Sequence, residues 1–330
     1  MTRLAMLPTR PAFSAADIDL DPAAESDRIV AALRRQVRDT LRRRGVVLGV
    51  SGGVDSSLCL ALAVAAFGRE NVLALMMPER DSDPESLRLG REVAEGFGTQ
   101  VALEDIGRTL DAMGCYARRD AAIRTVEPAY GPGWSARVVP ADPPAGAEDG
   151  LPSLIVRSPD GEIRRVRLRA ATYQALIAAT NMKQRTRKQM EYYHADRMNY
   201  AVLGTPNKLD DDQGFCVKNG DGAADVKPIA HLYKSQVYQL AEFLGVPEGI
   251  RRRPPADAWS LPQSQEDFHV ALPWRAMDLC LAGLSLGATA GEVSACAGLD
   301  EDQVERVWRD IAARHAATAA LHLPPLMVDD

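Results

Sequence analysis

Residues 46–58 read Val-Val-Leu-Gly-Val-Ser-Gly-Gly-Val-Asp-Ser-Ser-Leu, and this stretch decides the fold. Its apolar start predicts a buried strand, Ser51-Gly-Gly-Val predicts a turn, and an apolar helix follows from Asp55. Gly52 and Gly53 can take positive φ and carry no side chain, so the backbone can approach an anion closely. The helix adds free N–H groups and the positive end of its dipole. The segment is therefore expected to hold phosphate.

Hydroxyl and carboxylate side chains complete this loop. Ser51, Ser56 and Ser57 can donate hydrogen bonds to phosphate oxygens. Asp55 places a carboxylate beside them, which is reasonable only if a divalent cation lies between it and the phosphates. The loop is not a Walker P-loop, because no Gly-Lys-Ser/Thr follows at the required spacing. Since a strand, a turn and a capped helix also occur without any ligand, the interpretation needs a second half of the site.

Strands alternate with helices on both sides of the loop. The apolar patterns predict a helix from Ser26 to about Gly45, strands 46–50, 72–76, 100–103, 153–157, 163–168 and 200–203, and helices 55–67, 84–97 and 234–244. Alternation of this kind implies βαβ units and a parallel sheet. We expect a doubly wound, Rossmann-like α/β sheet flanked by helices, with the loop at the carboxyl end of the first strand, where such sheets bind ligands.

The remaining regions have other patterns. Residues 1–25 are expected to form an irregular lead-in, and residues 26–330 a single domain. Prolines and glycines between about 126 and 170 predict an inserted excursion with a hairpin turn at Ser158-Pro-Asp-Gly161. The C-terminal segment from about 260 to 330 is expected to be helical.

Composition restricts the class of protein. The 330 residues are 46% hydrophobic and carry a formal net charge of −6, which argues against a nucleic-acid partner because such proteins usually have a basic face. The five cysteines include no Cys-x-x-Cys pair, so we expect neither a zinc site nor a disulfide framework, and a reducing cytoplasm is the simplest location. No stretch has the pattern of a signal peptide or the length of a membrane span.

Residues 204–225 supply a candidate for the second half of the site. They follow the predicted strand 200–203 and are rich in glycine and carboxylates. Such a loop is usually just solvated, but after a second parallel strand it can face the first loop at the same edge of the sheet. Asp55 and Asp210 could then share Mg²⁺ bound to the phosphates of ATP. Lys218 could neutralise charge that builds up on the reacting phosphoryl group.

Cations lie near both loops in the sequence. Lys183 and Arg187 are one helical turn apart, and Arg185 lies on a different face. Surface cations usually have no such role, but the nearby anion loops favour phosphate or carboxylate binding by at least one of them. Lys234 begins a predicted helix, where a cation is slightly unfavourable against the dipole, and this is compatible with a functional role.

The motifs together resemble a known family. Ser51-Gly-Gly-Val-Asp-Ser-Ser57 is similar to the pyrophosphate loop of the N-type ATP pyrophosphatases. Across about 46–103 and about 178–260 the chain resembles the NAD synthetases, which amidate nicotinic acid adenine dinucleotide. The resemblance implies an adenine nucleotide α-hydrolase-like fold, a homodimer, ATP as substrate and Mg²⁺. Because no nitrilase-like segment precedes the loop, ammonia is expected to come free or from a separate glutaminase.

The resemblance also implies roles for individual positions. Its ATP contacts fall on Gly49, Ser51, Gly52, Gly53, Asp55, Ser56, Thr205 and Lys234. Its magnesium ligands fall on Asp55 and Asp210, the second being Glu in most of the family. Its contacts to the acid dinucleotide fall on Arg185, Lys218 and Asp225, and its catalytic residues on Lys218, Asp55 and Asp210.

Three segments depart from the family pattern. These are residues 254–267, the C-terminal stretch 319–325 where a basic Lys-Arg element is absent, and the long excursion at about 126–170. We therefore expect an amide ligase that adenylates nicotinic acid adenine dinucleotide and transfers ammonia to give NAD, AMP and pyrophosphate. Two alternatives stay open: the same chemistry on another acid, such as a sugar acid or a natural-product precursor, and a nucleotide-binding homologue without turnover.

Overall fold

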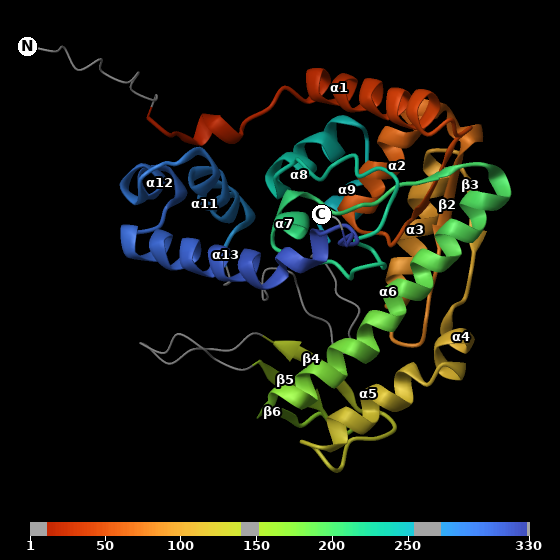
Figure 1. Ribbon diagram of the computed structural model, residues 1–330, viewed down its shortest axis with the longest axis vertical. Helices are drawn as coiled ribbons and strands as arrows, with labels where there is room; N and C mark the ends of the chain where they lie inside the picture. Colours follow the sequence, from red (N-terminus) through yellow and green to blue (C-terminus); the bar gives the residue numbers. More distant parts are fainter. Residues whose placement is uncertain (1–11, 140–151, 254–271, 329–330) are drawn as a thin grey trace, which may run out of the picture.

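The central sheet of the protein is parallel and four-stranded. The computed structural model describes residues 12–139, 152–253 and 272–328. The sheet has the strand order β3-β2-β1-β7. Its strands are β1 (Val46–Gly49), β2 (Val72–Met76), β3 (Gln100–Leu103) and β7 (Ala201–Val202). β1 and β7 are neighbours although they lie far apart in the sequence, so the loops that follow them meet at one edge of the sheet. Figure 1 shows this sheet at the strands labelled β2 and β3.

Helices cover both faces of this sheet, which confirms the predicted α/β class. One face packs against α1 (Pro22–Arg34), α2 (Val54–Phe67), α3 (Pro84–Gly96) and α8 (Lys234–Phe243), and the other against α4 (Gly107–Ala112), α5 (Cys115–Arg124) and α6 (Ala170–Met198). Val46 and Leu48 belong to the first core and Val47 to the second, as the alternation of side chains along a strand requires. The sheet is therefore buried on both faces.

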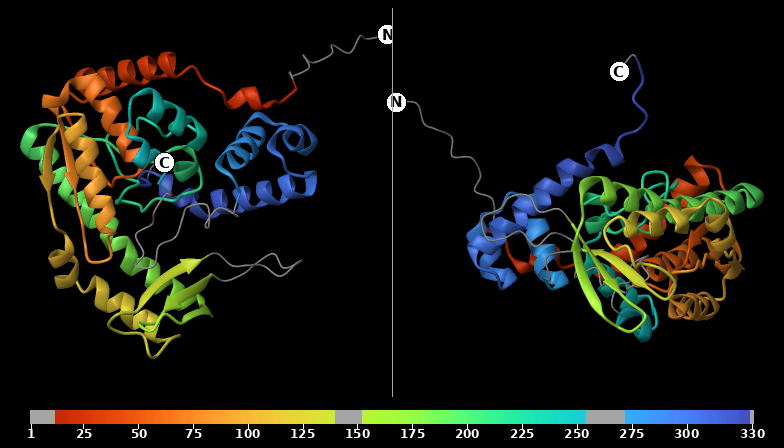
Figure 2. Two further views of the ribbon diagram at one scale, coloured as in Figure 1. Left: turned by 180° about the vertical axis from the view of Figure 1, so that it is seen from behind. Right: turned by 90° about the horizontal axis from the view of Figure 1, so that it is seen from below.

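The excursion forms a second, antiparallel sheet. Its strands are β4 (Ser135–Val139), β5 (Ser153–Arg157) and β6 (Ile163–Arg167), in that order. Leu154 and Val156 point into a small core shared with Leu176 of α6, and Figure 2 shows the strands against the amino-terminal half of that helix. The hairpin of β5 and β6 was predicted from the sequence. β4 was not, because prolines and glycines surround it.

The C-terminal part is helical, as expected. Its helices are α11 (Trp274–Leu286), α12 (Ala290–Ala297) and α13 (Glu301–His322), and they share a core with Phe13 and Ile18 from the other end of the chain. The lead-in is consequently more ordered than predicted: a 3₁₀-helix covers Ala15–Ile18 and α1 begins at Pro22, where Asp21 caps it.

Smaller elements complete the described chain. The helix expected up to Gly45 ends as α1 at Arg34 and continues as a π-helical segment over Arg35–Thr40. The others are a 3₁₀ turn (Arg69–Asn71), α7 (Lys208–Asp212) and α9 (Glu248–Arg251). All five cysteines are free thiols. Within the residues described, no helix has the length and apolar character needed to cross a membrane.

Candidate active site

The loop between β1 and α2 is held by its own hydroxyl groups. Ser56 Oγ accepts from the Ser51 backbone N–H at 3.2 Å and donates to the Gly53 carbonyl at 3.1 Å. Ser57 Oγ donates to the same carbonyl at 2.8 Å, and its side chain is fully buried. Ser51 and Ser56 therefore remain at the cavity surface, whereas Ser57 supports the loop from within.

Two glycines allow close packing around this loop, and at Gly52 the backbone conformation requires glycine. Gly52 has φ +74°, and a Cβ on it would lie 2.6 Å from the Ser86 carbonyl oxygen. Gly53 has φ −90°, so the positive φ considered for both glycines occurs only at Gly52. Gly49, at the end of β1, leaves room for a side chain from α6, because an added Cβ would lie 3.0 Å from Glu191 Oε1. The backbone here is thus in close contact with α3 and α6.

Two carboxylates converge beside the loop. Asp55 opens α2, and Asp210 lies in α7, after β7. Asn207 Nδ2 donates to Asp55 Oδ1 at 3.1 Å and to Asp210 Oδ2 at 2.6 Å. Lys234 Nζ lies 2.5 Å from Asp55 Oδ2 and is almost completely buried. The structure therefore brings together the two carboxylates that the sequence placed at the same edge of the sheet.

Asn207 is a residue of this cluster that the sequence reading missed. Its Oδ1 caps α7 by accepting from the backbone N–H groups of Leu209 and Asp210. With its acceptor used in this way, its amide N–H₂ faces the two carboxylates. The signal in the sequence was only that of an ordinary helix cap, so nothing there distinguished Asn207 from a structural residue.

The electrostatics of the cluster reflect crowding of like charge. Burial raises the pKa of Asp210, and the neighbouring Asp55 raises it further, to about 7. Burial alone lowers the pKa of Lys234, but the charges of Asp55 and Asp210 outweigh it, so the pKa of Lys234 lies above its usual value. The cluster thus holds one cation against two carboxylates and has capacity for a further positive charge.

That capacity fits a magnesium ion held together with substrate phosphates. Mg²⁺ is typically held in proteins through one or two carboxylates plus phosphate oxygens and water. Within the described residues, no group of three or more His, Cys, Asp or Glu side chains forms a complete metal cage. Asp55 and Asp210 offer carboxylate oxygens of the kind that Mg²⁺ prefers, and the loop between β1 and α2 lies beside them.

We expect the metal-free protein to lose stability as the pH rises from about 4 to about 7. The folded-state pKa of Asp210 lies above its ordinary value of 3.8, so in this range the folded state binds more protons than the unfolded state. Ionisation of Asp210 as the pH rises therefore disfavours folding. Urea denaturation in the presence of a chelator measures the slope of the free energy of unfolding against pH. Asp210→Asn should flatten it, and identical slopes for variant and wild type would contradict this explanation.

A cavity of about 350 Å³ opens over the cluster. Of the residues expected to bind ATP or metal, Gly49, Ser51, Gly53, Asp55, Ser56, Thr205 and Asp210 line it. Lys234 lies behind Asp55, which it contacts, and Gly52 packs against α3. Residues 254–267, where the sequence departs from the family pattern, lie outside the described residues. The preceding residue, Arg253, lines the cavity and pairs with Asp83 at 2.6 Å.

The residues expected to bind the acid lie elsewhere. Lys218 Nζ is exposed and donates to the carbonyls of Ala320 and Leu323 at 2.9 and 3.2 Å, at the end of α13. Arg185 Nε donates to the Lys218 carbonyl at 3.2 Å. Asp225 is also exposed and accepts from the Val202 backbone N–H at 2.8 Å. The structure does not bring Lys218 to the carboxylate cluster, so its expected role in charge neutralisation stays a prediction.

One wall of the cavity comes from α6. Its lining residues are Gln184, Arg187, Lys188 and Glu191, with Asp221 from the loop after α7. Lys188 Nζ lies 2.5 Å from Glu191 Oε2, and burial raises the pKa of Glu191. Of these four α6 residues, the sequence analysis identifies only Arg187 as a candidate. The spacing of positions 184, 187, 188 and 191 is nevertheless that of one helical face.

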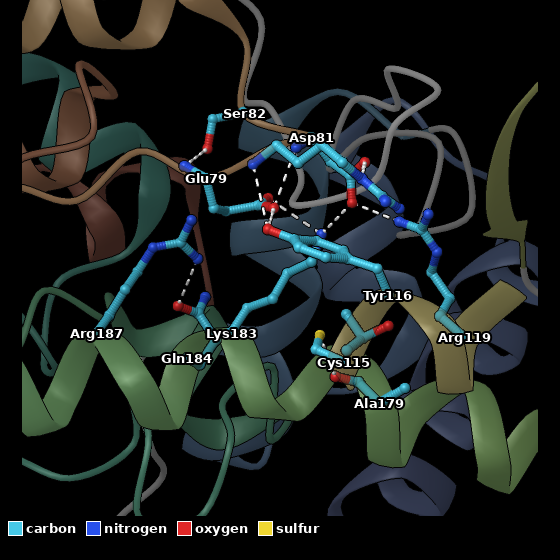
Figure 3. Close-up of polar contacts among 12 residues, drawn as sticks. Glu79, Asp81, Ser82, Cys115, Tyr116, Arg119, Ala179, Lys183, Gln184 and Arg187 are labelled. Carbon is cyan, nitrogen blue, oxygen red and sulfur yellow. Dashed lines mark hydrogen bonds and ion pairs between the residues drawn. The ribbon is translucent and has the colours of Figure 1, made fainter. Parts of the chain in front are cut away.

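A charged network fixes the loop after β2 beside this wall. Lys183 Nζ lies 2.7 Å from Asp81 Oδ2 and 3.1 Å from Glu79 Oε1, and Asp81 also contacts Arg119. Tyr116 donates its hydroxyl to Glu79 Oε2 at 2.9 Å (Figure 3). Burial acts to raise the pKa of Asp81, but the charges of Lys183 and Arg119 prevail and hold it below its usual value. Lys183 is therefore a structural cation.

Comparison with known proteins finds similar sequences along almost the whole chain. A sequence model of the NAD synthase family matches residues 25–127 and 160–316. The chain is 62% identical over 318 residues to the NH(3)-dependent NAD(+) synthetase of Rhizobium rhizogenes, covering 96% of each. It is also 62% identical over 317 residues to that of Rhizobium meliloti, covering 96% of this chain and 95% of the relative.

Solved structures show the same fold. The NMN synthetase from Francisella tularensis superposes with a TM-score of 0.67 at 20% identity, covering 94% of this chain and all of that one. The NH3-dependent NAD synthetase from Campylobacter jejuni does so with a TM-score of 0.62 at 21% identity and the same coverage. The stretch that the family model leaves out, between residues 127 and 160, contains β4 and β5.

Proposed function

This chain belongs to the NAD synthase family, and we propose that it is an ammonia-dependent ligase that converts nicotinic acid adenine dinucleotide to NAD with cleavage of ATP to AMP and pyrophosphate. The observation that carries the proposal is the meeting of Asp55 and Asp210 beside the Ser51–Ser56 loop in one cavity. A metal-binding carboxylate pair next to a phosphate loop is what cleavage of ATP to pyrophosphate needs.

The chemistry explains why ATP is required. A carboxylate does not react with ammonia in water, because oxide would have to leave. When the carboxylate oxygen attacks the α-phosphorus of ATP, pyrophosphate leaves and an acyl-adenylate forms. Ammonia then attacks the acyl carbon and AMP leaves with the bonding electron pair. The protein must therefore bring two anions together, position them and exclude water.

Each half of the described site contributes to this task. The backbone N–H groups at the start of α2, with Ser51 and Ser56, would hold the departing pyrophosphate. Asp55 and Asp210 would hold Mg²⁺, which when bound offsets the negative charge of the phosphates. Asn207 bridges the two carboxylates, and Lys234 orients Asp55 through their ion pair. Thr205 lines the same cavity, and its proposed role is a contact to ATP.

Binding of the acid is assigned to another part of the surface. Arg185, Lys218 and Asp225 lie in or beside the α6 and 218–225 segments, and all three are exposed. We propose that they contact the acid dinucleotide in a homodimer, in which a second copy covers this surface. Free ammonia is the proposed nitrogen source, with a separate glutaminase as a possible supplier. Five free thiols fit a cytoplasmic location.

The test is an assay of products. Purified protein with ATP, Mg²⁺, ammonium and nicotinic acid adenine dinucleotide should give NAD, AMP and pyrophosphate in equal amounts. Parallel reactions replace the dinucleotide with its mononucleotide or with sugar acids, and ammonium with glutamine. Pyrophosphate release with another acid but not with the dinucleotide would transfer the proposal to that acid. No AMP with any acid would indicate a nucleotide-binding homologue without turnover.

A further inference from the structure

Lys183 and Arg187 are cations of α6 that lie one helical turn apart. They differ in whether carboxylates surround them. Lys183 is enclosed by the carboxylates of Glu79 and Asp81, so its charge is compensated within the fold. Arg187 has no such partner: in the part of the chain that the structure describes, it forms no ion pair with a carboxylate. Figure 3 shows its side chain reaching from α6 toward the loop after β2, beside Lys183.

The contacts of Arg187 hold the guanidinium without neutralising it. Its Nε donates to the Met77 carbonyl at 3.3 Å, and its Nη1 donates to Gln184 Oε1 at 3.2 Å. A guanidinium has five N–H donors, so most of its donor capacity stays available. Gln184 in turn donates to Asp221 Oδ2 at 3.2 Å, which fixes the amide orientation that Arg187 uses. The Arg187 guanidinium is therefore oriented by two neutral oxygen acceptors.

A partly buried cation without an ion-pair partner is unfavourable for the fold. Burial lowers the pKa of Arg187, and the more distant carboxylates of Glu79 and Asp221 only partly oppose this effect. A buried charge without a partner destabilises a protein by several kcal/mol, in contrast to a paired one. Arg187 nevertheless lines the cavity that contains Asp55 and Ser51. A substrate anion is the partner that the fold itself does not supply.

The position of Arg187 selects which anion this is. Met77, to which it is bonded, follows the end of β2, directly beside the end of β1 from which the phosphate loop starts. That loop accounts for the pyrophosphate portion of ATP. The anions left to accommodate are the α-phosphoryl group and the attacking carboxylate, which meet at the reacting centre. A planar fork of donors suits two oxygens of one such group.

We infer that Arg187 is a catalytic residue that binds the α-phosphoryl oxygens during attack by the carboxylate and then holds the phosphate of the acyl-adenylate. This inference rests on the proposed function. In the step, the bond between the carboxylate oxygen and the α-phosphorus forms, the bond from that phosphorus to the bridging oxygen breaks, and pyrophosphate leaves. No proton is transferred, and the guanidinium remains charged throughout. The stabilisation that the Arg187 guanidinium provides increases as negative charge builds up on the α-phosphoryl group.

The experiment compares Arg187→Gln and Arg187→Lys in acid-dependent exchange of labelled pyrophosphate into ATP. We expect Arg187→Gln to lower kcat for exchange roughly 10²-fold with little change in KM for ATP, since the loss falls on the transition state. Arg187→Lys keeps the charge but not the fork, so its loss should be intermediate. Arg91→Gln, on the exposed face of α3, is the matched control and should behave as wild type.

A second measurement separates a catalytic from a structural role. A non-hydrolysable acyl-adenylate mimic should bind Arg187→Gln about 10²-fold more weakly, whereas a methylene analogue of ATP should bind almost as well as to wild type. Exchange by Arg187→Gln within threefold of wild type would overturn the inference, as would a loss confined to KM for ATP. If wild type itself shows no exchange with any acid, the proposed function fails instead, so the two failures are distinguishable.

Discussion

Replacing Asp55 with asparagine is expected to lower kcat for adenylation by at least about 10³-fold while the protein remains folded. The substitution keeps the size of the side chain and removes the carboxylate of one of the two proposed metal ligands. Lys234 then lacks its closest partner, at 2.5 Å, and is expected to pair with Asp210 instead. Asp210 would be withdrawn from the metal, so both ligands are lost by one change.

The measurement is pyrophosphate release against Mg²⁺ concentration, with thermal melts recorded alongside. Asp27→Asn, on the exposed face of α1, removes one negative charge elsewhere and should leave both activity and metal dependence unchanged. In the Asp55→Asn variant, added Mg²⁺ should no longer improve binding of ATP. Activity within tenfold of wild type, with normal dependence on Mg²⁺, would show that Asp55 is not a metal ligand.

The half of the site that is proposed to hold ATP could be predicted from the sequence because its signals are local. The Ser51–Ser57 stretch contains strand end, turn and helix start together, and Asp210 follows a second apolar strand. Their meeting depends on one fact of topology, namely that β7 pairs with β1 rather than with an outer strand. Parallel strands present their loops at the same edge, so that fact was sufficient.

The α6 wall could not be predicted because it depends on the rotation of a long helix. α6 runs from Ala170 to Met198 and has polar residues on every side, so periodicity does not show which side faces the cavity. Lys183 and Arg187 are equivalent in the sequence, yet only the three-dimensional structure places Glu79 and Asp81 around the first. Asn207 was missed for a similar reason, because its amide becomes functional only when Asp55 lies opposite it.

Replacing Lys183 with methionine is expected to destabilise the fold by about 3–5 kcal/mol at neutral pH. Methionine fills similar space, so the loss arises from the carboxylates of Glu79 and Asp81, which remain buried without their shared cation. Arg119 still contacts Asp81, whereas Glu79 keeps only the Tyr116 hydroxyl, so Glu79 is the carboxylate that loses its ion-pair partner. The substitution Glu79→Gln in the same background should therefore restore part of the stability.

The dependence of this loss on pH distinguishes a charge effect from a packing effect. In the wild type, cations hold the pKa of Asp81 below its ordinary value of 3.8, so its stabilising contribution is present above that pH and is lost as the pH falls through the folded-state pKa. Without Lys183, the carboxylates bind protons more readily. The difference in free energy of unfolding between Lys183→Met and wild type should therefore become smaller as the pH is lowered.

Urea denaturation across this range of pH measures that difference. Arg88→Met, which removes two exposed ion pairs on α3, should leave the free energy of unfolding nearly unchanged at every pH. A loss for Lys183→Met that is equally small, or that does not change with pH, would mean that the network around Glu79 does not support the cavity wall.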